Sequence, residues 1–460
     1  MKLNVLKLSH LVRPRTHEGA PAVAVSPELA LRRSVLACML WEDEFYEDGV
    51  AIAGRIRELV PKVDAAKVAA LAVEARTAMK LRHAPLLLVR EMARHATHRA
   101  LVAETMTRVI QRADELAEFV AIYWKDGRAP LSGQVKKGLA AAFPKFDEYA
   151  LAKYDRAGAV RLRDVLFLCH AKPRDAEQAA VWKRLVDGEL ATPDTWEVAL
   201  SSGGDKREHW ERLLSERKLG ALALLRNLRN MKDAGVSDEL VVAVLGEMKT
   251  ERVLPFRFIS AAKHAPQLEA ELERAMFGCL SAQKLLPGKT ILIVDCSGSM
   301  HGQISARSEL DRLSAAAALA MLLREVCDKV SIYATAGSDS ARKHATMLIP
   351  SRRGFALRDL LSYGQTSPKL GGGGIFLTQV MDYVRKEEHG TADRIIVITD
   401  EQDCDLVNKP SSAHPFGKRN YLINVASYKN GIGYGEWVHI DGWSEAVVEY
   451  IRELERSKAE

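Results

Sequence analysis

The spacing of the apolar residues changes near residue 285, and this change constrains the fold more than any other feature of the sequence. Before it, apolar residues recur at steps of three and four, as in residues 65–80 and 114–125, which predicts amphipathic helices. After it, helical stretches such as residues 308–326 and 377–388 alternate with short β-rich apolar runs. These runs are residues 291–296, 330–336, 394–399 and 421–426. We therefore expect an α + α/β multidomain protein.

The all-α part should cover residues 27–285, after an N-terminal extension of residues 1–26. Short turns, such as residues 142–147 and 170–175, separate its helices as they would in an α-solenoid of paired antiparallel helices. The sequence letters show no fixed period, so a helical bundle without a repeat stays open as the alternative.

The α/β part should cover residues 286–460. Alternating strands and helices predict a doubly wound, Rossmann-like parallel sheet with helices on both faces. A chain of 460 residues also exceeds what one hydrophobic core usually supports. Ligands of such sheets bind outside the carboxyl ends of the strands, where the loops gather.

Charge is unevenly divided between the two parts. Residues 286–460 hold 21 Lys and Arg against 22 Asp and Glu, a net charge of −1, whereas residues 1–285 hold 45 against 38, a net charge of +7. A polyanion, if one is bound, should therefore meet the helical part. An ordinary solvated surface is the alternative reading of this modest excess.

Cysteine usage and hydropathy indicate a cytoplasmic protein. The six cysteines are scattered without a CxxC pair, which favours a reducing compartment over a zinc ribbon or a disulfide framework. Residues 1–15 lack the apolar core of a signal peptide, and no segment approaches the roughly 20 apolar residues that span a bilayer. We expect no association with membranes.

A D-x-S-x-S loop follows the first expected strand. Asp295 would supply a carboxylate, Ser297 and Ser299 two hydroxyl oxygens, and Gly298 a tight turn between them. Asp400 ends a later strand, and adjacent parallel strands end at the same edge of a sheet. Oxygen ligands of this kind predict a Mg²⁺ site. The alternative is a simple turn in which Asp295 caps a helix.

Two other groups of residues are weaker candidates for chemistry. Glu91, His95 and His98 share a helical face, but HExxH is absent, and a solvated or RNA-facing stripe is the favoured interpretation. Cys296 lies beside Ser297 without a Ser-His-Asp order or a phosphate loop to activate it, so we expect a packed cysteine.

The D-x-S-x-S loop with Asp400 resembles the metal-ion-dependent adhesion site of von Willebrand A domains. In that family a threonine on a third loop completes the site. The matching loop here offers Gly374 or Ile375, and Thr378 lies one helical turn later. The resemblance therefore implies a cation site that binds weakly, or only together with a partner's carboxylate.

The helical part resembles the TROVE domain of the Ro family. Residues 130–173 are similar to its RNA-binding core, with a basic helix, a Lys-Tyr pair and a helix that ends in His-x-Lys-Pro. Residues 31–49, 220–231 and 252–261 match further family segments. The family implies a monomeric ring of HEAT-like repeats, whose outer surface binds Y RNA and whose hole takes single-stranded ends of misfolded RNA.

The matched segment is strongly basic, because residues 125–174 hold eleven Lys and Arg against five Asp and Glu. Such density can neutralise phosphates. The resemblance carries RNA contacts onto Lys136, Lys137, Lys153, Arg156, Arg161, Arg163, His170 and Lys172, with Arg226 and Arg229 as second choices. Asp155 and Ala157 stand where the family has cations, and a packed helix-end residue is the alternative for His170.

We therefore expect a non-enzymatic RNA-binding protein that acts in the quality control, stability or processing of noncoding RNA. The resemblance implies Y-like RNA and misfolded RNA as partners, an exoribonuclease such as polynucleotide phosphorylase, and no DNA. One alternative is a protein-binding scaffold whose metal loop grips an acidic side chain. A metal-dependent phosphohydrolase is a more distant one, because no general base accompanies Asp295.

Overall fold

The computed structural model describes residues 26–36, 49–79, 81–201, 203–248, 253, 255–281, 284–304, 310–363, 369–401, 403–405, 413–426, 436–441 and 446–457. The expected N-terminal extension lies outside these residues except for Ser26. The chain divides into two compact units. We call residues 27–40 and 50–213 the helical unit, and residues 214–460, with 1–26 and 41–49, the sheet unit.

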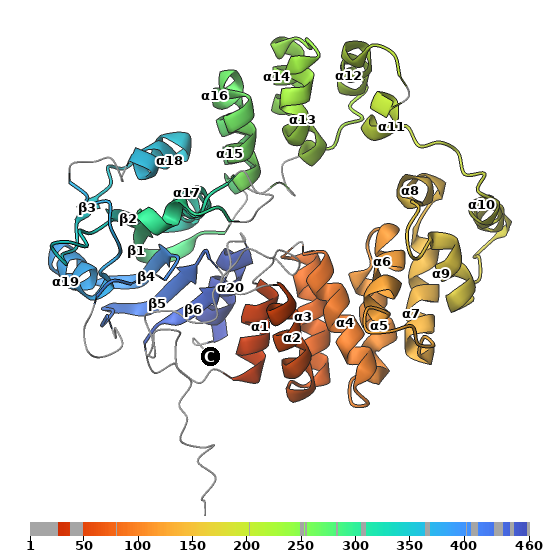
Figure 1. Ribbon diagram of the computed structural model, residues 1–460, viewed down its shortest axis with the longest axis horizontal. Helices are drawn as coiled ribbons and strands as arrows, with labels where there is room; N and C mark the ends of the chain where they lie inside the picture. Colours follow the sequence, from red (N-terminus) through yellow and green to blue (C-terminus); the bar gives the residue numbers. More distant parts are fainter. Residues whose placement is uncertain are drawn as a thin grey trace, which may run out of the picture. The chain divides into compact units, whose positions relative to one another are not determined.

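The helical unit is a succession of short helices (Figure 1). They are α1 (Pro27–Leu36), α2 (Gly49–Leu59), η2 (Val60–Lys62), α3 (Ala65–Thr77), α4 (His83–Arg94), η3 (Arg99–Leu101), α5 (Val102–Val109), α6 (Asp114–Tyr123), α7 (Gly133–Ala142), η4 (Phe143–Lys145), α8 (Glu148–Tyr154), α9 (Leu162–Cys169), α10 (Ala176–Asp187), α11 (Trp196–Ser201) and α12 (Lys206–Ser215). Most contacts join helices that are near neighbours along the chain: α3 packs on α4 and α5, α4 on α6, and α5 on α7. This pattern is that of stacked helix pairs.

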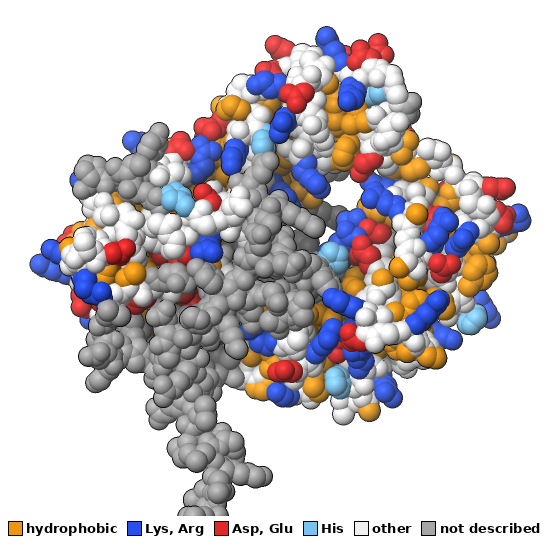
Figure 2. Space-filling model, in the orientation of Figure 1, with side chains coloured by type: hydrophobic (Ala, Val, Ile, Leu, Met, Phe, Trp, Pro, Cys, Tyr) orange, Lys and Arg blue, Asp and Glu red, His pale blue; other side chains and the backbone are white. Residues whose placement is uncertain are grey.

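Ion pairs between helices recur at a nearly constant separation along the helical unit. Their partners lie between 36 and 42 residues apart. The pairs are Arg32 with Glu74, Arg76 with Glu115, Arg82 with Glu118, Arg90 with Asp126, and Glu148 with Arg184. These pairs show a period that the sequence letters hide, because each repeat uses different residues to make an equivalent bridge. Figure 2 shows Lys and Arg side chains over these helices, with Asp and Glu among them.

One break in the helical unit is not visible in the sequence. The helical spacing runs from residue 85 to 110, yet α4 ends at Arg94 and α5 begins at Val102. His98 lies in this break and is buried, with Nε2 3.0 Å from the carbonyl oxygen of Val63 and Nδ1 2.9 Å from the Thr97 hydroxyl. The turn is therefore stabilised by a tertiary contact rather than by a Gly or Pro.

The sheet unit begins with four helices and continues as an α/β domain (Figure 1). Its elements are α13 (Ala221–Asp233), α14 (Asp238–Glu247), α15 (Pro255–His264), η5 (Pro266–Leu268), α16 (Glu269–Ser281), β1 (Leu286–Asp295), η6 (Gly298–His301), α17 (Arg312–Val326), β2 (Cys327–Thr335), β3 (Thr346–Leu348), α18 (Gly354–Tyr363), α19 (Leu377–Glu387), β4 (Ala392–Thr399), β5 (Gly417–Asn424), β6 (Val438–Asp441) and α20 (Ala446–Ser457). The strand order is β3-β2-β1-β4-β5-β6, parallel except for β3. The expected α + α/β architecture is confirmed.

Helices α15 and α16 pack with the α/β domain, although the sequence pattern changes only after them. Both contact α17, and α16 also contacts α18. The Glu273 carboxylate accepts a hydrogen bond of 2.7 Å from the backbone of Phe355 at the start of α18, and Arg358 pairs with Glu269. The spacing of apolar residues changes near residue 285 because helices give way to strands there. The boundary between the two compact units lies at residue 214.

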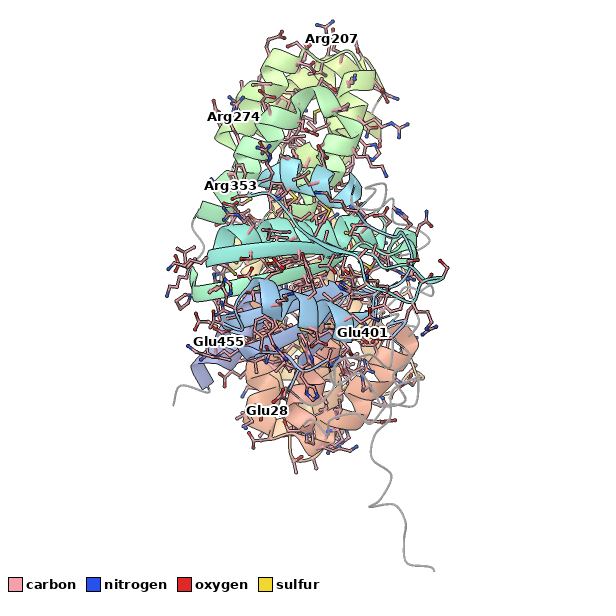
Figure 3. The ribbon with its side chains drawn as sticks, turned by 90° about the vertical axis from the view of Figure 1, so that its left-hand side faces the viewer. Glu28, Arg207, Arg274, Arg353, Glu401 and Glu455 are labelled. Carbon is pink, nitrogen blue, oxygen red and sulfur yellow. The ribbon has the colours of Figure 1, made fainter. Side chains whose placement is uncertain are left out.

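Helices cover both faces of the sheet. Successive residues of a strand point to opposite faces. Ile395 of β4 lies in a core with α19, whereas the neighbouring Arg394 reaches Glu455 of α20 with an Nε to Oε1 distance of 2.6 Å. Figure 3 labels Glu455 on this helix. Arg394 also donates to the Thr290 hydroxyl, and Tyr421 donates to Glu455, so this buried pair is hydrogen-bonded on both sides.

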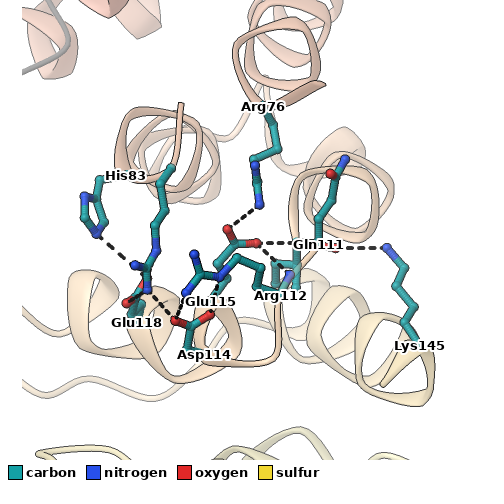
Figure 4. Close-up of polar contacts among 10 residues, drawn as sticks. Arg76, His83, Gln111, Arg112, Asp114, Glu115, Glu118 and Lys145 are labelled. Carbon is teal, nitrogen blue, oxygen red and sulfur yellow. Dashed lines mark hydrogen bonds and ion pairs between the residues drawn. The ribbon is translucent and has the colours of Figure 1, made fainter. Parts of the chain in front are cut away.

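We predict that Glu115→Ala strongly destabilises the helical unit. The fully buried Glu115 carboxylate accepts 2.6 Å from Arg76 Nη2 and 2.7 and 3.0 Å from the backbone N–H groups of Gln111 and Arg112 (Figure 4). Removing it leaves the Arg76 guanidinium, whose side chain is only 11% exposed, and two backbone N–H groups unpaired, which should cost about 3–5 kcal/mol of unfolding free energy.

The matched control is Asp187→Ala, which removes the exposed partner of Lys183 on α10 and should leave the melting temperature unchanged. Calorimetry of both variants tests the argument. Equal melting temperatures would show that the buried pair contributes no more than a surface pair.

Candidate nucleic-acid interface and metal site

The carboxyl ends of β1 and β4 meet at one edge of the sheet, where the strand order reverses. These strands are parallel neighbours, with Val294 beside Ile398. Asp295 and Asp400 therefore lie at the same edge, and both are fully buried. The serine hydroxyls of Ser297 and Ser299 are 3.1 Å apart beside them. The structure thus brings together all four residues that the sequence suggested.

The carboxylates of Asp295 and Asp400 at this edge repel each other. Burial, and then the nearby charge of Asp400, raise the pKa of Asp295 to about 7. Hydrogen bonds partly offset this, since the Thr399 hydroxyl donates to Asp295 Oδ2 at 2.6 Å and the Ser297 N–H to Oδ1 at 2.8 Å. A cation held among these oxygens would relieve the remaining repulsion.

Arg312 already supplies one positive charge at this edge. Its Nη1 donates to Asp400 Oδ2 at 2.9 Å and to the backbone oxygen of Ser299 at 3.3 Å. Within the described ranges no three His, Cys, Asp or Glu residues cluster as metal ligands, so a metal here depends on the serine hydroxyls. Two carboxylates and two hydroxyls are hard oxygen donors that fit Mg²⁺, with Arg312 as a competitor for Asp400.

The loop around Gly374, where the adhesion-site family has a threonine, has no room for a side chain at that position. This loop lies against the serine loop, since a Cβ at Gly298 would be 3.4 Å from the backbone oxygen of Gly372. A Cβ at Gly374 would lie 2.1 Å from Cys404 Sγ, so the thiol occupies the space that a side chain would need. Burial and the adjacent Asp339 carboxylate raise the pKa of Cys404 to about 11, so the thiol is neutral. Ile375 is buried, and Thr378 lies on α19.

The residues expected to contact RNA fall into two sets. Arg226 and Arg229 are exposed on α13 of the sheet unit. The others belong to the helical unit: Lys136 and Lys137 on α7, Lys153 on α8, Arg156 and Arg161 before α9, Arg163 on α9, and His170 and Lys172 after it. The eight residues of the helical unit therefore lie within one stretch of the chain, residues 136–172, from α7 to the turn after α9.

Several of these side chains have no protein partner. Among the described residues, no side-chain hydrogen bond or ion pair involves the side chains of Lys136, Lys137, Arg156, His170, Lys172 or Arg226. The remaining four are engaged. Arg161 pairs with Asp155 at 2.9 Å, Arg163 and Arg229 have carboxylates at 4.0 and 3.9 Å, and Lys153 lies over the rings of Tyr149 and Tyr154. The first group can offer its charge to phosphates without breaking a contact.

His170 is exposed, so the alternative of a packed helix-end residue is wrong. It ends α9 in the left-handed conformation, with φ of 54° and ψ of 42°. Asn, Asp and His adopt this region more often than other residues with a Cβ. The imidazole therefore stands at the surface next to Lys172.

The interpretation of Glu91, His95 and His98 as a solvated stripe is wrong. Glu91 and His98 are only 3% and 2% exposed. Glu91 accepts a hydrogen bond of 2.6 Å from the buried Arg90, and His98 is fixed to the backbone of Val63. Cys296 is buried as expected, and burial raises the pKa of its thiol well above the usual range.

The sequence did not indicate one pocket in the helical unit. It has a volume of about 370 Å³ and is lined by Arg82, Arg112, Tyr154 and Arg156, among others. Arg82 and Arg156 are far apart in the chain, and no local pattern signals that they meet. The dense positive charge of the region was the sequence signal that could have indicated this pocket.

Comparison with known proteins identifies similar chains. A family model described as the TROVE domain matches residues 183–317, which extends past the expected boundary at residue 285 into α17. The crystal structure of the Deinococcus radiodurans RO (RSR) protein has a similar fold, with a TM-score of 0.64 and 18% identity over 92% of this chain and 98% of that chain.

Two curated relatives match a shorter stretch. Telomerase protein component 1 of Mus musculus is 42% identical over 89 residues, and that of Rattus norvegicus is 40% identical over 89 residues. Each match covers 18% of this chain and 3% of the relative. This chain therefore matches only a small part of each relative's length. No described helix is long and apolar enough to cross a membrane.

Proposed function

We propose that this chain, which belongs to the Ro/TROVE family, binds RNA and that the helical unit makes the main contacts. The observation that carries this proposal is a group of cations without a protein partner from α7 to the turn after α9, all of them exposed except the half-buried Lys136. We call Lys136, Lys137, Arg156 and Lys172 the free cations. Together with His170 they offer phosphate contacts and one group able to stack on a base.

The positive charge of this surface is uncompensated, whereas many arginines elsewhere in the helical unit are neutralised by carboxylates. Arg76, Arg82 and Arg184 pair with carboxylates on another helix, and Arg90 pairs with Asp126 in the turn after α6. The free cations do not, so their charge faces solvent and can replace the counterions of a phosphate backbone.

We further propose that the RNA is structured, Y-like noncoding RNA or misfolded RNA with a single-stranded end, and that the protein acts in RNA quality control in the cytoplasm. An exoribonuclease of the polynucleotide phosphorylase type would be the partner. The resemblance of residues 130–173 to the RNA-binding core of the Ro family supports these finer points. Sequencing of the RNA that co-purifies with the full chain tests them: ribosomal or messenger fragments alone would contradict the choice of RNA.

We predict that Lys137→Ala combined with Arg156→Ala lowers the magnitude of the slope of log affinity against log salt by about one to two, because two phosphate contacts are lost. Fluorescence anisotropy with a hairpin RNA over a salt series measures the slope. The matched control is Lys183→Ala with Arg207→Ala. It removes the same charge, but from cations already paired with Asp187 and Glu211. An equal loss of slope in both double variants would contradict specific phosphate contacts.

We predict that His170→Ser weakens RNA binding by about 1–3 kcal/mol while leaving the salt slope unchanged, because a stacking or hydrogen-bonding group is lost and no cation. Since the imidazole is exposed, the melting temperature should stay the same. A loss of binding that merely follows a lower melting temperature would show that His170 acts on folding instead.

We also propose that the strand-end oxygens of Asp295, Ser297, Ser299 and Asp400 hold Mg²⁺. The like-charged, buried carboxylates support this second proposal. When bound, the ion would supply a Lewis-acidic centre that accepts an oxygen from a partner's carboxylate or phosphate. Without a threonine beside Gly374, and with Arg312 on Asp400, the protein holds the ion with few ligands of its own, so binding should be weak.

We predict that millimolar Mg²⁺ raises the melting temperature of the wild type and has no effect on Asp295→Asn. Stabilisation by about 1 kcal/mol corresponds to about 2–4 °C. In EDTA the variant should melt at or above the wild type, because it no longer buries a carboxylate beside Asp400. Asp382→Asn on the exposed side of α19 is the control and should respond to Mg²⁺ like the wild type. A Mg²⁺ response that survives in Asp295→Asn would show that the loop is only a turn.

A further inference from the structure

A pocket of about 370 Å³ opens on the helical unit between the start of α4, α6 and the loop that precedes α9. Arg82, just before α4, and Arg112, just before α6, line one side of it, and Tyr154 at the end of α8 and Arg156 of the following loop line the other. Its volume falls within the range of about 300–1,000 Å³ that small-ligand pockets show. The pocket lies wholly within one compact unit.

The charges around the pocket favour an anion. Arg82 donates to Glu118 Oε2 at 3.1 Å and also to Asp114. Arg112 donates to Asp114 at 2.8 Å (Figure 4). Two carboxylates thus offset two of the three guanidiniums. Arg156 is exposed and has no ion pair with any described residue, so it leaves one net positive charge at the pocket.

The same pocket offers flat surfaces. The guanidinium carbon of Arg112 lies 4.7 Å from the centre of the Tyr154 ring. Guanidinium planes and aromatic rings are the groups on which proteins stack unpaired nucleobases. A cationic phosphate contact and a stacking surface therefore occur within one cavity of suitable size.

Small residues of the loop keep the pocket open. Ala157, Gly158 and Ala159 line it, and a Cβ at Gly158 would meet only the backbone oxygen of Val160 at 3.8 Å. A lysine or arginine at position 157 would have a long side chain at this wall. Asp155 in turn pairs with Arg161.

We propose that this pocket holds one unpaired nucleotide of a bound RNA strand, with its phosphate at Arg156 and its base against Arg112 and Tyr154. The inference rests on the proposed RNA-binding function and deepens it. RNA is favoured over an acidic peptide because the pocket combines charge with flat stacking groups, and because Arg156 is also one of the free cations between α7 and α9.

Filling the pocket without changing its charge tests this proposal. Ala121 is an exposed residue of α6 that lines the pocket, so Ala121→Phe adds bulk there and keeps every cation. The matched control is Ala70→Phe, the same change at an exposed position of α3 that does not line the pocket. Both variants are made in the full chain, and their melting temperatures are compared with that of the wild type.

Two RNAs are used, one blunt hairpin and one identical hairpin with a single-stranded 3′ tail that contains 2-aminopurine. We expect Ala121→Phe to weaken binding of the tailed RNA by about tenfold, the effect of losing one stacked base. Binding of the blunt hairpin, and the salt slope, should not change. The fluorescence change of 2-aminopurine on binding should be present with the wild type and Ala70→Phe and absent with Ala121→Phe.

The outcomes separate this proposal from the proposed function. If the wild type binds neither RNA, the RNA-binding function itself fails. If all three proteins bind the tailed RNA equally, or if Ala121→Phe weakens both RNAs alike, the pocket holds no nucleotide although RNA binding stands. If a poly-glutamate peptide displaces the tailed RNA from the wild type but not from Ala121→Phe, the pocket is a site for acidic peptides and the proposal is overturned.

Discussion

Buried ion pairs between helices one repeat apart are the interactions on which the helical unit most depends. Arg90 is fully buried and bonds Glu91 and Asp126, and Glu115 is fully buried beneath Arg76. Charges in such places are tolerated only because each has a partner in good geometry, so the stacking of consecutive helices and the pairing of these charges require each other. The same pairs remove much of the positive charge of residues 76–112 from the surface.

In the proposed function, this division of charge would decide where RNA binds. Arginines that bridge helices serve the fold, whereas Lys136, Lys137, Arg156 and Lys172, which lie from α7 to the turn after α9, have no protein partner among the described residues. The three arginines of the pocket combine a role in the fold with a role in binding: Arg82, Arg112 and Arg156. The first two are tied to Asp114 and Glu118, yet they line a pocket to which Arg156 adds an unpaired charge. A surface that is only modestly basic in total thus has a localised region of uncompensated charge.

In the sheet unit it is negative charge that is concentrated, at the carboxyl ends of β1 and β4. Parallel pairing forces Asp295 and Asp400 together, and burial makes their repulsion costly. Arg312 relieves part of it from within the protein, and Cys404 fills the space beside Gly374 where a further ligand would stand. If this edge holds Mg²⁺ as proposed, these two features would weaken its binding, while Arg312 stabilises the edge without the ion.

The sequence by itself determined that the first part is helical and that the second alternates strands with helices. It also determined that Asp295 and Asp400 lie at strand ends. Periodicity and strand order could be predicted because they are local properties that nearby residues encode. The sequence also located the basic segment from residue 125 to 174. It missed the short strands β3 and β6, which have too few residues for a pattern, and the break at His98, which a distant carbonyl stabilises. Only the tertiary structure decided that Glu91 is buried, that Cys404 excludes a side chain at Gly374, and that Arg82, Arg112 and Arg156 share a pocket. Each of these depends on which residues, tens of positions apart, packing brings into contact, and no local spacing encodes that.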